Sequence, residues 1–306
     1  MKKTLVLIML ILLAGARTAL SCSIVVVKNG NNKTPMAQVA RTFYDELHHN
    51  LNLPAHGFKS IAPHVFWEID TSENPIKSAV EKRIREAQPD LILALGRDAL
   101  LAVRDIRDIP VIYLLVVAPE IIIEGRDNIT GVNLEIPPDL QFDELGRLLP
   151  QVRRIGVIYN TAHSAMNIQQ ARLDRPDLQF VALNAQSTRE VPALLEELRG
   201  RVDLIWLLPD LVVTNSDILE SYFLFSFRNK VPVLAFSEKY LKRGAAIVVT
   251  FDLQAMAEQA AVMAARIIGG APVSAVPRMN ISRVKTIINP AIVRKLQLAI
   301  TEERPR

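Results

Sequence analysis

The chain has 306 residues, of which 50% are hydrophobic and 22% are charged, enough for two domains of ordinary size with separate cores. Three of its 36 basic residues and none of its acidic ones lie in the first 21 positions, so the rest of the chain is close to neutral. That balance excludes the clustered basic face that nucleic-acid binding requires.

The first residues predict an export signal. Lys2 and Lys3 precede an apolar run at 5–14, and small residues follow it up to Ser21. A charged start, a short apolar stretch and a small-residue exit are typical of a secretory signal peptide, predicted here as residues 1–21. The apolar run is shorter than the roughly 20 residues that span a bilayer. We therefore expect export, in preference to a cytoplasmic protein with an apolar first helix.

The single cysteine, Cys22, stands at the predicted cleavage point and has no partner for an intrachain disulfide. Two interpretations stay open. Cys22 is either a lipoprotein cysteine that anchors the mature N-terminus, or a free thiol left by ordinary cleavage nearby. Both place the protein outside the cytoplasm, periplasmic or lipid-anchored on the outer side of a membrane.

Strand and helix signals alternate from residue 23 onwards. Thr34 and Pro35 form a helix start, and apolar residues recur at helical spacing up to Leu47. Strands are predicted at 23–27, 61–69, 90–95 and 111–117, and a further strand or crossover at 128–134. Helices are predicted from 76 to 87, from 99 to 103 and from 138 to 149. Strands joined by helices in this way form a doubly wound half-sheet.

A second series of the same kind follows. Its strands are predicted at 155–159, 178–183, 204–208, 231–236 and 246–251, and its helices at 162–173, 191–198, 217–227 and 253–268. The strands are rich in Val, Ile and Leu, as expected for parallel strands buried on both faces. The fold class predicted is α/β, with two similar doubly wound parallel-sheet lobes.

Signatures of catalysis are absent from the sequence. It holds no phosphate-binding glycine motif, no nucleophile elbow and no zinc-protease motif, and none of its five histidines forms an i, i+4 pair. We therefore expect no enzymatic activity, no cofactor and no metal site.

Polar residues follow the carboxyl ends of the predicted strands, where ligands bind in open parallel sheets. Apolar strands with polar ends suit a cleft with apolar walls and a few orienting groups, although polar residues also serve turns. The predicted ligand-binding residues at these ends are Asn31, Thr34, Gly96, Arg97, Tyr159, Asn160, Asp210, Ser237 and Glu238.

Several segments resemble the ABC transporter substrate-binding family that includes tryptophan- and tyrosine-type binding proteins. They are N-I-T-G-V-N at 128–133, L-L-P at 148–150, I-G-V-I-Y-N at 155–160, L-P-D at 208–210 and F-S-E-K-Y-L-K-R-G-A at 236–245. The resemblance runs from about residue 23 to about residue 298. Its most specific parts are the I-T-G-V and K-R-G-A segments.

The resemblance implies a type I periplasmic-binding fold with two lobes, three hinge crossings and a ligand cleft between the lobes. Lobe 1 would comprise residues 23–125 and 245–275, and lobe 2 residues 126–244 and 276–306. The resemblance adds Ser164 and Asp252 to the ligand-binding residues. The partners it implies are a small solute and a membrane permease, and we expect a monomer that binds no nucleic acid.

Two segments depart from the family pattern. The first loop lacks a His-Pro pair, and the fourth strand ends in Val117-Ala118-Pro119, where Thr-Asp-Pro is usual. Both alter the first-lobe face of the pocket, so the predicted ligand is a small solute, an amino acid or related compound, rather than an aromatic amino acid in particular.

For a zwitterionic solute, Arg97 or loop amides would bind the carboxylate, and Asp210 or Glu238 would bind the amine. Tyr159 is the better candidate for stacking, since Trp67 and Trp206 lie in mid-strand, where aromatic residues usually belong to the core. Two alternative functions remain. One is a sensory module that reports to a membrane receptor kinase, and the other is a two-lobe enzyme of the glycosyltransferase type.

Overall fold

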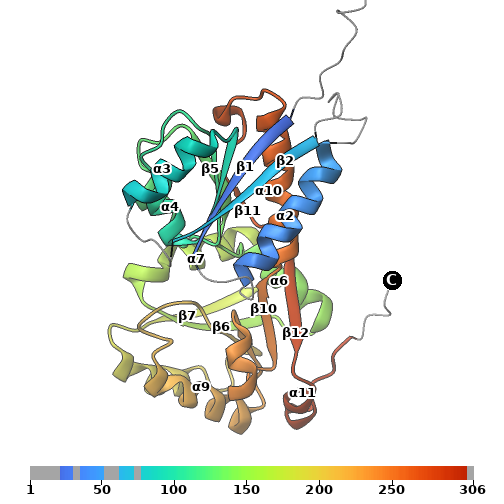
Figure 1. The fold of residues 1–306 in the computed structure, drawn as a ribbon. Helices are drawn as coiled ribbons and strands as arrows, with labels where there is room; N and C mark the ends of the chain where they lie inside the picture. Colours follow the sequence, from blue (N-terminus) through green and yellow to red (C-terminus); the bar gives the residue numbers. More distant parts are fainter. Residues whose placement is uncertain (1–20, 30–34, 52–61, 72–76, 302–306) are drawn as a thin grey trace, which may run out of the picture. The chain divides into compact units, whose positions relative to one another are not determined.

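The computed structural model describes residues 21–29, 35–51, 62–71 and 77–301. It divides into two compact α/β units (Figure 1). Unit 1 runs up to Glu135 and includes Leu253–Asn280, and unit 2 comprises Ile136–Asp252 and the chain from Ile281 on. The chain therefore passes between the units at three places, as the resemblance implied.

The sheet of unit 1 has six parallel strands in the order β2-β1-β3-β4-β5-β11. The strands are β1 (Ser21–Lys28), β2 (Ala62–Asp70), β3 (Leu91–Leu95), β4 (Val111–Leu114), β5 (Ile129–Asn133) and β11 (Met279–Asn280). The side chains of β3 and β4 are all buried, which explains why these strands read as uninterrupted apolar runs.

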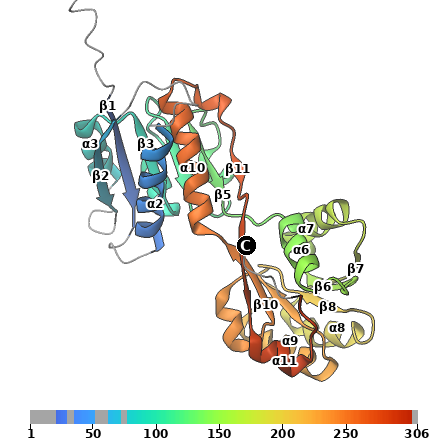
Figure 2. The same ribbon diagram turned by 90° about the vertical axis from the view of Figure 1, so that its right-hand side faces the viewer.

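Helices cover both faces of this sheet. They are α2 (Pro35–Leu51), α3 (Lys77–Ala87), α4 (Arg97–Val103), α5 (Glu120–Ile123) and α10 (Leu253–Ile268). Figure 1 shows α3 and α4 on one side of the sheet and α2 and α10 on the other. In Figure 2, α2 and α10 lie side by side, and the two helices pack against each other. The predicted bounds of 253–268 for α10 are confirmed.

Unit 2 repeats the topology. Its sheet has the order β7-β6-β8-β9-β10-β12, parallel except that β12 runs antiparallel to β10. The strands are β6 (Arg154–Tyr159), β7 (Gln179–Asn184), β8 (Leu204–Trp206), β9 (Val233–Ala235), β10 (Ile247–Phe251) and β12 (Val284–Ile288). The helices are α6 (Pro138–Leu148), α7 (Thr161–Asp174), α8 (Val191–Glu197), α9 (Ser216–Asn229) and α11 (Pro290–Leu296).

Trp206 belongs to the core of unit 2, as the mid-strand interpretation predicted. It is 1% exposed, and its indole nitrogen donates a hydrogen bond to Gln141 Oε1 at 2.9 Å. Its ring meets that of Phe142 edge-on, with centroids 4.9 Å apart. The side chain of Trp67 lies outside the described part of the structure.

The unit boundaries fall later in the chain than the predicted lobe boundaries. Strand β5, which falls in the predicted lobe 2, pairs with β4 and with β11 in the sheet of unit 1. Strand β10, which falls in the predicted lobe 1, pairs with β9 in unit 2. The physical reason is that a strand belongs to the sheet that satisfies its backbone hydrogen bonds, and sequence patterns do not reveal that partner.

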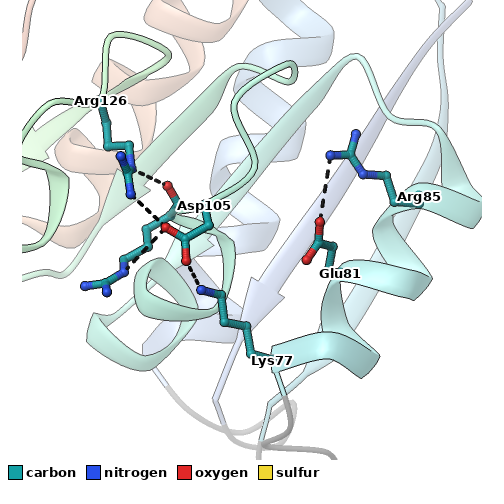
Figure 3. A network of polar contacts seen from close by, with 6 residues as sticks. Lys77, Glu81, Arg85, Asp105 and Arg126 are labelled. Carbon is teal, nitrogen blue, oxygen red and sulfur yellow. Dashed lines mark hydrogen bonds and ion pairs between the residues drawn. The ribbon is translucent and has the colours of Figure 1, made fainter.

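An ionic network holds the connection between α4 and β4 (Figure 3). Asp105 accepts from Arg126 Nη2 at 2.7 Å and also pairs with Lys77 of α3. Arg126 Nε donates to the carbonyl oxygen of Arg104 at 2.7 Å. Because most of these charges are exposed, each pair contributes well under about 1 kcal/mol, and the network mainly orients the connection.

Candidate functional site

The carboxyl ends of the strands place most of the predicted residues in two groups, one in each unit. In both sheets the chain order reverses beside the first strand of the unit, between β1 and β3 and between β6 and β8. Such switch points are where open α/β sheets bind ligands. Polar contacts join the two sides of each switch point. We call the carboxyl ends of the strands around each switch point the edge of that unit, and these two edges form the candidate site.

In unit 2 the contacts across the switch point converge on Asp210. Its Oδ2 accepts from the backbone nitrogen of Asn160 at 2.8 Å and from Ser164 Oγ at 2.8 Å. Its Oδ1 accepts from the backbone nitrogen of Val212 at 2.9 Å. The Asp210 carboxylate thus joins the end of β6, the first turn of α7 and the loop after β8.

The burial of Asp210 changes its predicted role. The residue is only 1% exposed, and three donors already occupy its carboxylate. A buried carboxylate that is satisfied in this way holds neighbouring segments together and is not available to bind a solute amine. We therefore assign Asp210 to the framework of the edge, which leaves Glu238 as the predicted carboxylate for such a group.

Asn160 is a second anchor of this edge. It caps α7, with Oδ1 accepting from the backbone nitrogen of Ala162 at 3.1 Å, and its Nδ2 donates to the carbonyl oxygen of Ala185 at 2.8 Å. Asn160 and Ser164 are 9% and 4% exposed. Tyr159, just before them, lines a shallow pocket of about 360 Å3 against Ile168 and other residues of α7.

The remaining predicted residues of unit 2 lie at the ends of β9 and β10, beside β12. Glu238 pairs with Lys285 at 3.0 Å, and Asp252 lies 3.6 Å from Arg283. Ser237 is half-buried beside Glu238. Sequence reasoning missed Lys285 and Arg283. Strand β12 runs antiparallel to β10, and only that pairing brings the start of β12 to the carboxyl end of β10.

In unit 1 the switch point is joined by Asn29, at the end of β1, and Asp98, in the first turn of α4. Asn29 Nδ2 donates to Asp98 Oδ2 at 2.9 Å. Gly96 has a φ of +88°, and its backbone nitrogen donates to the carbonyl oxygen of Leu114 at 2.9 Å, so the ends of β3 and β4 are tied together. Arg97 is exposed at this edge. Asn31 and Thr34 lie outside the described residues.

A buried lysine at the end of β1 is a residue that sequence reasoning missed. Lys28 is 2% exposed, and its Nζ lies 3.0 Å from a carboxylate oxygen of Glu68 in β2. A charge this deeply buried needs such a partner. The sequence signal that could have identified Lys28 is its place directly after a run of four aliphatic residues, all of which are buried in the structure.

Cys22 lies in β1 and is 4% exposed. Burial raises the pKa of its thiol to about 12, with further contributions from the charge of Asp90 and a hydrogen bond to it. Of the predicted signal peptide, all but Ser21 lies outside the described residues. Lipidation of Cys22 stays a prediction, and it would require the thiol to leave this buried position.

We predict that Cys22 is unreactive in the folded protein, because the thiolate is the reactive form and burial disfavours it. Iodoacetamide at pH 8 should alkylate the folded protein at least tenfold more slowly than the protein in urea, measured by mass spectrometry. Equal rates would show that β1 does not bury the thiol.

Within the described ranges, no group of three or more His, Cys, Asp and Glu side chains is arranged to hold a metal ion. No helix in the same ranges is both long and apolar enough to cross a membrane.

The chain is similar to proteins that bind solutes. A family described as ABC transporter substrate binding protein matches residues 52–304. A tyrosine-binding protein of Clostridioides difficile is 23% identical over 239 residues, covering 74% of this chain and 68% of that protein.

Solved structures that share the fold include the following two. One is a ligand-free, open substrate binding protein with adhesive properties from Clostridium difficile, with a TM-score of 0.67 and 21% identity over 93% of this chain and 96% of that one. The other is an ABC domain in complex with L-Trp from Streptococcus pneumonia, with a TM-score of 0.51 and 18% identity over 92% of this chain and 96% of that one. The chain is therefore a member of the ABC transporter substrate-binding protein family, whose members bind solutes outside the cytoplasm and are not enzymes.

Proposed function

We propose that this protein captures a small solute at the carboxyl edges of its two sheets and, as a monomer, delivers it to the permease of an ABC importer. The observation that carries the proposal is the edge built around Asp210 at the switch point of unit 2. Three hydrogen bonds hold that edge in place, and it stands where ligands bind in this class of sheet.

The proposed function needs only solute binding and no chemical step. A solute that contacts both edges favours the conformation in which both contacts are made, so its binding energy is enough to select a ligand-bound state for the permease. Arg97 supplies an exposed cation for an anionic group. Glu238 is exposed and paired with Lys285 at 3.0 Å, so a cationic group would share or replace that pairing. Amino acids are the first class to test, since one relative is a tyrosine-binding protein and another structure holds L-Trp.

The test is mass spectrometry of any ligand released from the purified protein, followed by a thermal-shift panel of amino acids, sugars and organic acids. A true ligand at 100 times its Kd stabilises the folded protein by about 2.7 kcal/mol. The variant Arg97→Ala should weaken binding of a carboxylate-bearing ligand by about tenfold to a hundredfold. The matched control Arg83→Ala removes an exposed arginine of α3 and should leave affinity unchanged.

The proposal fails if no ligand is released and no solute class shifts the unfolding temperature. An unchanged affinity in Arg97→Ala would remove the anion-binding role of that residue. Import itself is tested by uptake of the identified solute in cells that have or lack this protein, which separates transport from sensing.

A further inference from the structure

Six exposed basic side chains gather at the amino ends of the strands in unit 2, the end of the sheet opposite the candidate site. We call this cluster the basic patch, and it comprises Arg228, Lys230, Lys242, Arg243, Arg294 and Lys295. The chain as a whole has a formal charge of +4, so the patch carries more positive charge than the entire protein. The near-neutral balance of the sequence predicted no clustered basic face, and that prediction is wrong for unit 2, because an overall charge averages over surfaces that folding separates.

The strand order fixes the position of the patch. Helix α9 ends shortly before β9, and the short helix η3 (Glu238–Arg243) ends shortly before β10. Helix α11 follows β12, whose last residue Ile288 pairs with Ile247 at the start of β10 because the two strands are antiparallel. All three segments therefore meet at the amino ends of β9 and β10, away from the edge that Asp210 holds.

Side-chain hydrogen bonds hold these segments together. Lys230 Nζ donates to Gln297 Oε1 at 2.6 Å, which joins the end of α9 to the end of α11. Figure 2 shows these two helices next to each other. Asn289, which caps α11, donates from Nδ2 to the carbonyl oxygen of Leu241 in η3 at 2.9 Å. The six cations thus belong to one continuous surface.

The charge of the basic patch is not neutralised by nearby acids. Segments 227–230, 241–246 and 289–297 contain no acidic residue, and within the described ranges no carboxylate pairs with any of the six cations. The acid nearest in sequence, Glu238, pairs with Lys285. Cations in the last turns of α9 and α11 stabilise those helix ends. That role accounts for half of the patch, since the other three cations lie outside these two helices.

We propose that the basic patch binds the anionic headgroups of a phospholipid membrane surface. Members of the family act outside the cytoplasm, where the large anionic surface within reach is the outer face of a membrane. Each Lys or Arg close to such a surface strengthens binding about fivefold. Leu224, which is 44% exposed and precedes Arg228 by one helical turn, adds an apolar side chain beside the cations.

This inference goes beyond solute capture. The patch and the edge lie at opposite ends of the strands in unit 2, so membrane binding through the patch leaves the edge of that unit accessible. Membrane binding would restrict the search of the loaded protein for its permease to a surface. Solute affinity and membrane affinity should therefore change independently of each other.

The experiment measures co-sedimentation of the purified protein with two kinds of vesicle, one of phosphatidylcholine alone and one with about 30% phosphatidylglycerol. The patch variant reverses three of its charges and combines Lys242→Glu, Arg243→Glu and Arg294→Glu. The matched control reverses three exposed arginines of unit 1 and combines Arg41→Glu, Arg83→Glu and Arg107→Glu. The two variants have the same net charge, so only the place of the change differs. A lipid anchor at Cys22 would bind both kinds of vesicle, so the difference between them reports the patch.

We expect the wild type to bind the phosphatidylglycerol vesicles at least tenfold more tightly, and to lose that preference between about 50 and about 500 mM NaCl as the charges are screened. The patch variant should bind these vesicles at least about a hundredfold more weakly than the wild type, and the control variant within about threefold of it. Urea unfolding verifies that both variants are folded. If the patch variant does not fold, the lipid preference of the wild type and its loss in salt still decide the question.

Two results would overturn the inference. One is a wild type that binds both kinds of vesicle equally, or a patch variant that binds no more weakly than the control. The other is a wild type that retains a DNA duplex in preference to the phosphatidylglycerol vesicles at the same salt, which would identify nucleic acid as the partner of the patch. A protein that binds these vesicles but no solute would overturn the proposed function and leave this inference intact.

Discussion

Replacing Asp210 by alanine is expected to lower the free energy of unfolding of unit 2 by about 3–5 kcal/mol, the largest loss we expect from any polar side chain of the candidate site. The variant leaves the backbone nitrogens of Asn160 and Val212 and the hydroxyl of Ser164 without their acceptor in a buried place. Each unsatisfied donor costs about 1–3 kcal/mol, and partial relaxation keeps the sum below the maximum.

The measurement is urea unfolding followed by the fluorescence of Trp206, in a Trp67→Phe background so that unit 2 alone is reported. Asp210→Asn keeps the shape of the side chain but only one acceptor oxygen. It should lower the free energy of unfolding by about half as much as Asp210→Ala. Asp143→Asn is the control, since Asp143 is 72% exposed beside Arg175 and should change stability by less than about 0.5 kcal/mol. Equal stability of Asp210→Ala and the control would contradict the three buried hydrogen bonds.

Gly131→Ala should destabilise unit 1 by a comparable amount. A Cβ at Gly131 would lie 2.3 Å from the backbone oxygen of Tyr113 and 2.7 Å from its Cγ. Tyr113 is fully buried in the adjacent strand β4, so neither atom has room to move. We expect a loss of at least about 3 kcal/mol, or failure to fold, because overpacking against backbone cannot be relieved by a rotamer change.

Gly146→Ala is the matched control. Gly146 lies in α6, and its Cβ would come no closer than 3.8 Å to a neighbouring side chain. Alanine in a helix is favoured over glycine, so this variant should gain about 0.5–1 kcal/mol. Soluble yield and urea midpoints of the two variants test the contrast. A Gly131→Ala protein as stable as the wild type would show that β4 and β5 are not paired as described.

Much of the fold is predictable from the sequence because helices and parallel strands carry local signals. The apolar spacing after Pro35 predicts α2, and the alanine-rich run predicts α10 to the residue. Strands β11 and β12 escaped prediction because β11 has two residues and β12 is an edge strand of intermediate burial. Their partners, β5 and β10, are set by tertiary pairing and not by local pattern.

For the candidate site, the sequence predicted the positions of several residues but not their roles. The strand-end rule located Asn160 and Asp210, and the resemblance added Ser164, which donates to Asp210. The roles of these residues depend on burial and hydrogen bonding, which a sequence pattern does not give. Only the three hydrogen bonds that Asp210 accepts show that it stabilises the edge. The positive φ angles of Leu115 and Ala118 were not predictable either, because neither residue type favours that conformation.

The last strands of both sheets have a consequence for the order in which the protein is made. Residues 279–288 supply β11 to one sheet and β12 to the other, and α10, which packs against α2 of unit 1, directly precedes them. During synthesis, the first unit therefore lacks one covering helix and an edge strand until most of the chain has been translated. Neither unit can therefore complete its sheet before the same last segment of the chain has been made, so the two units finish folding together and not one after the other.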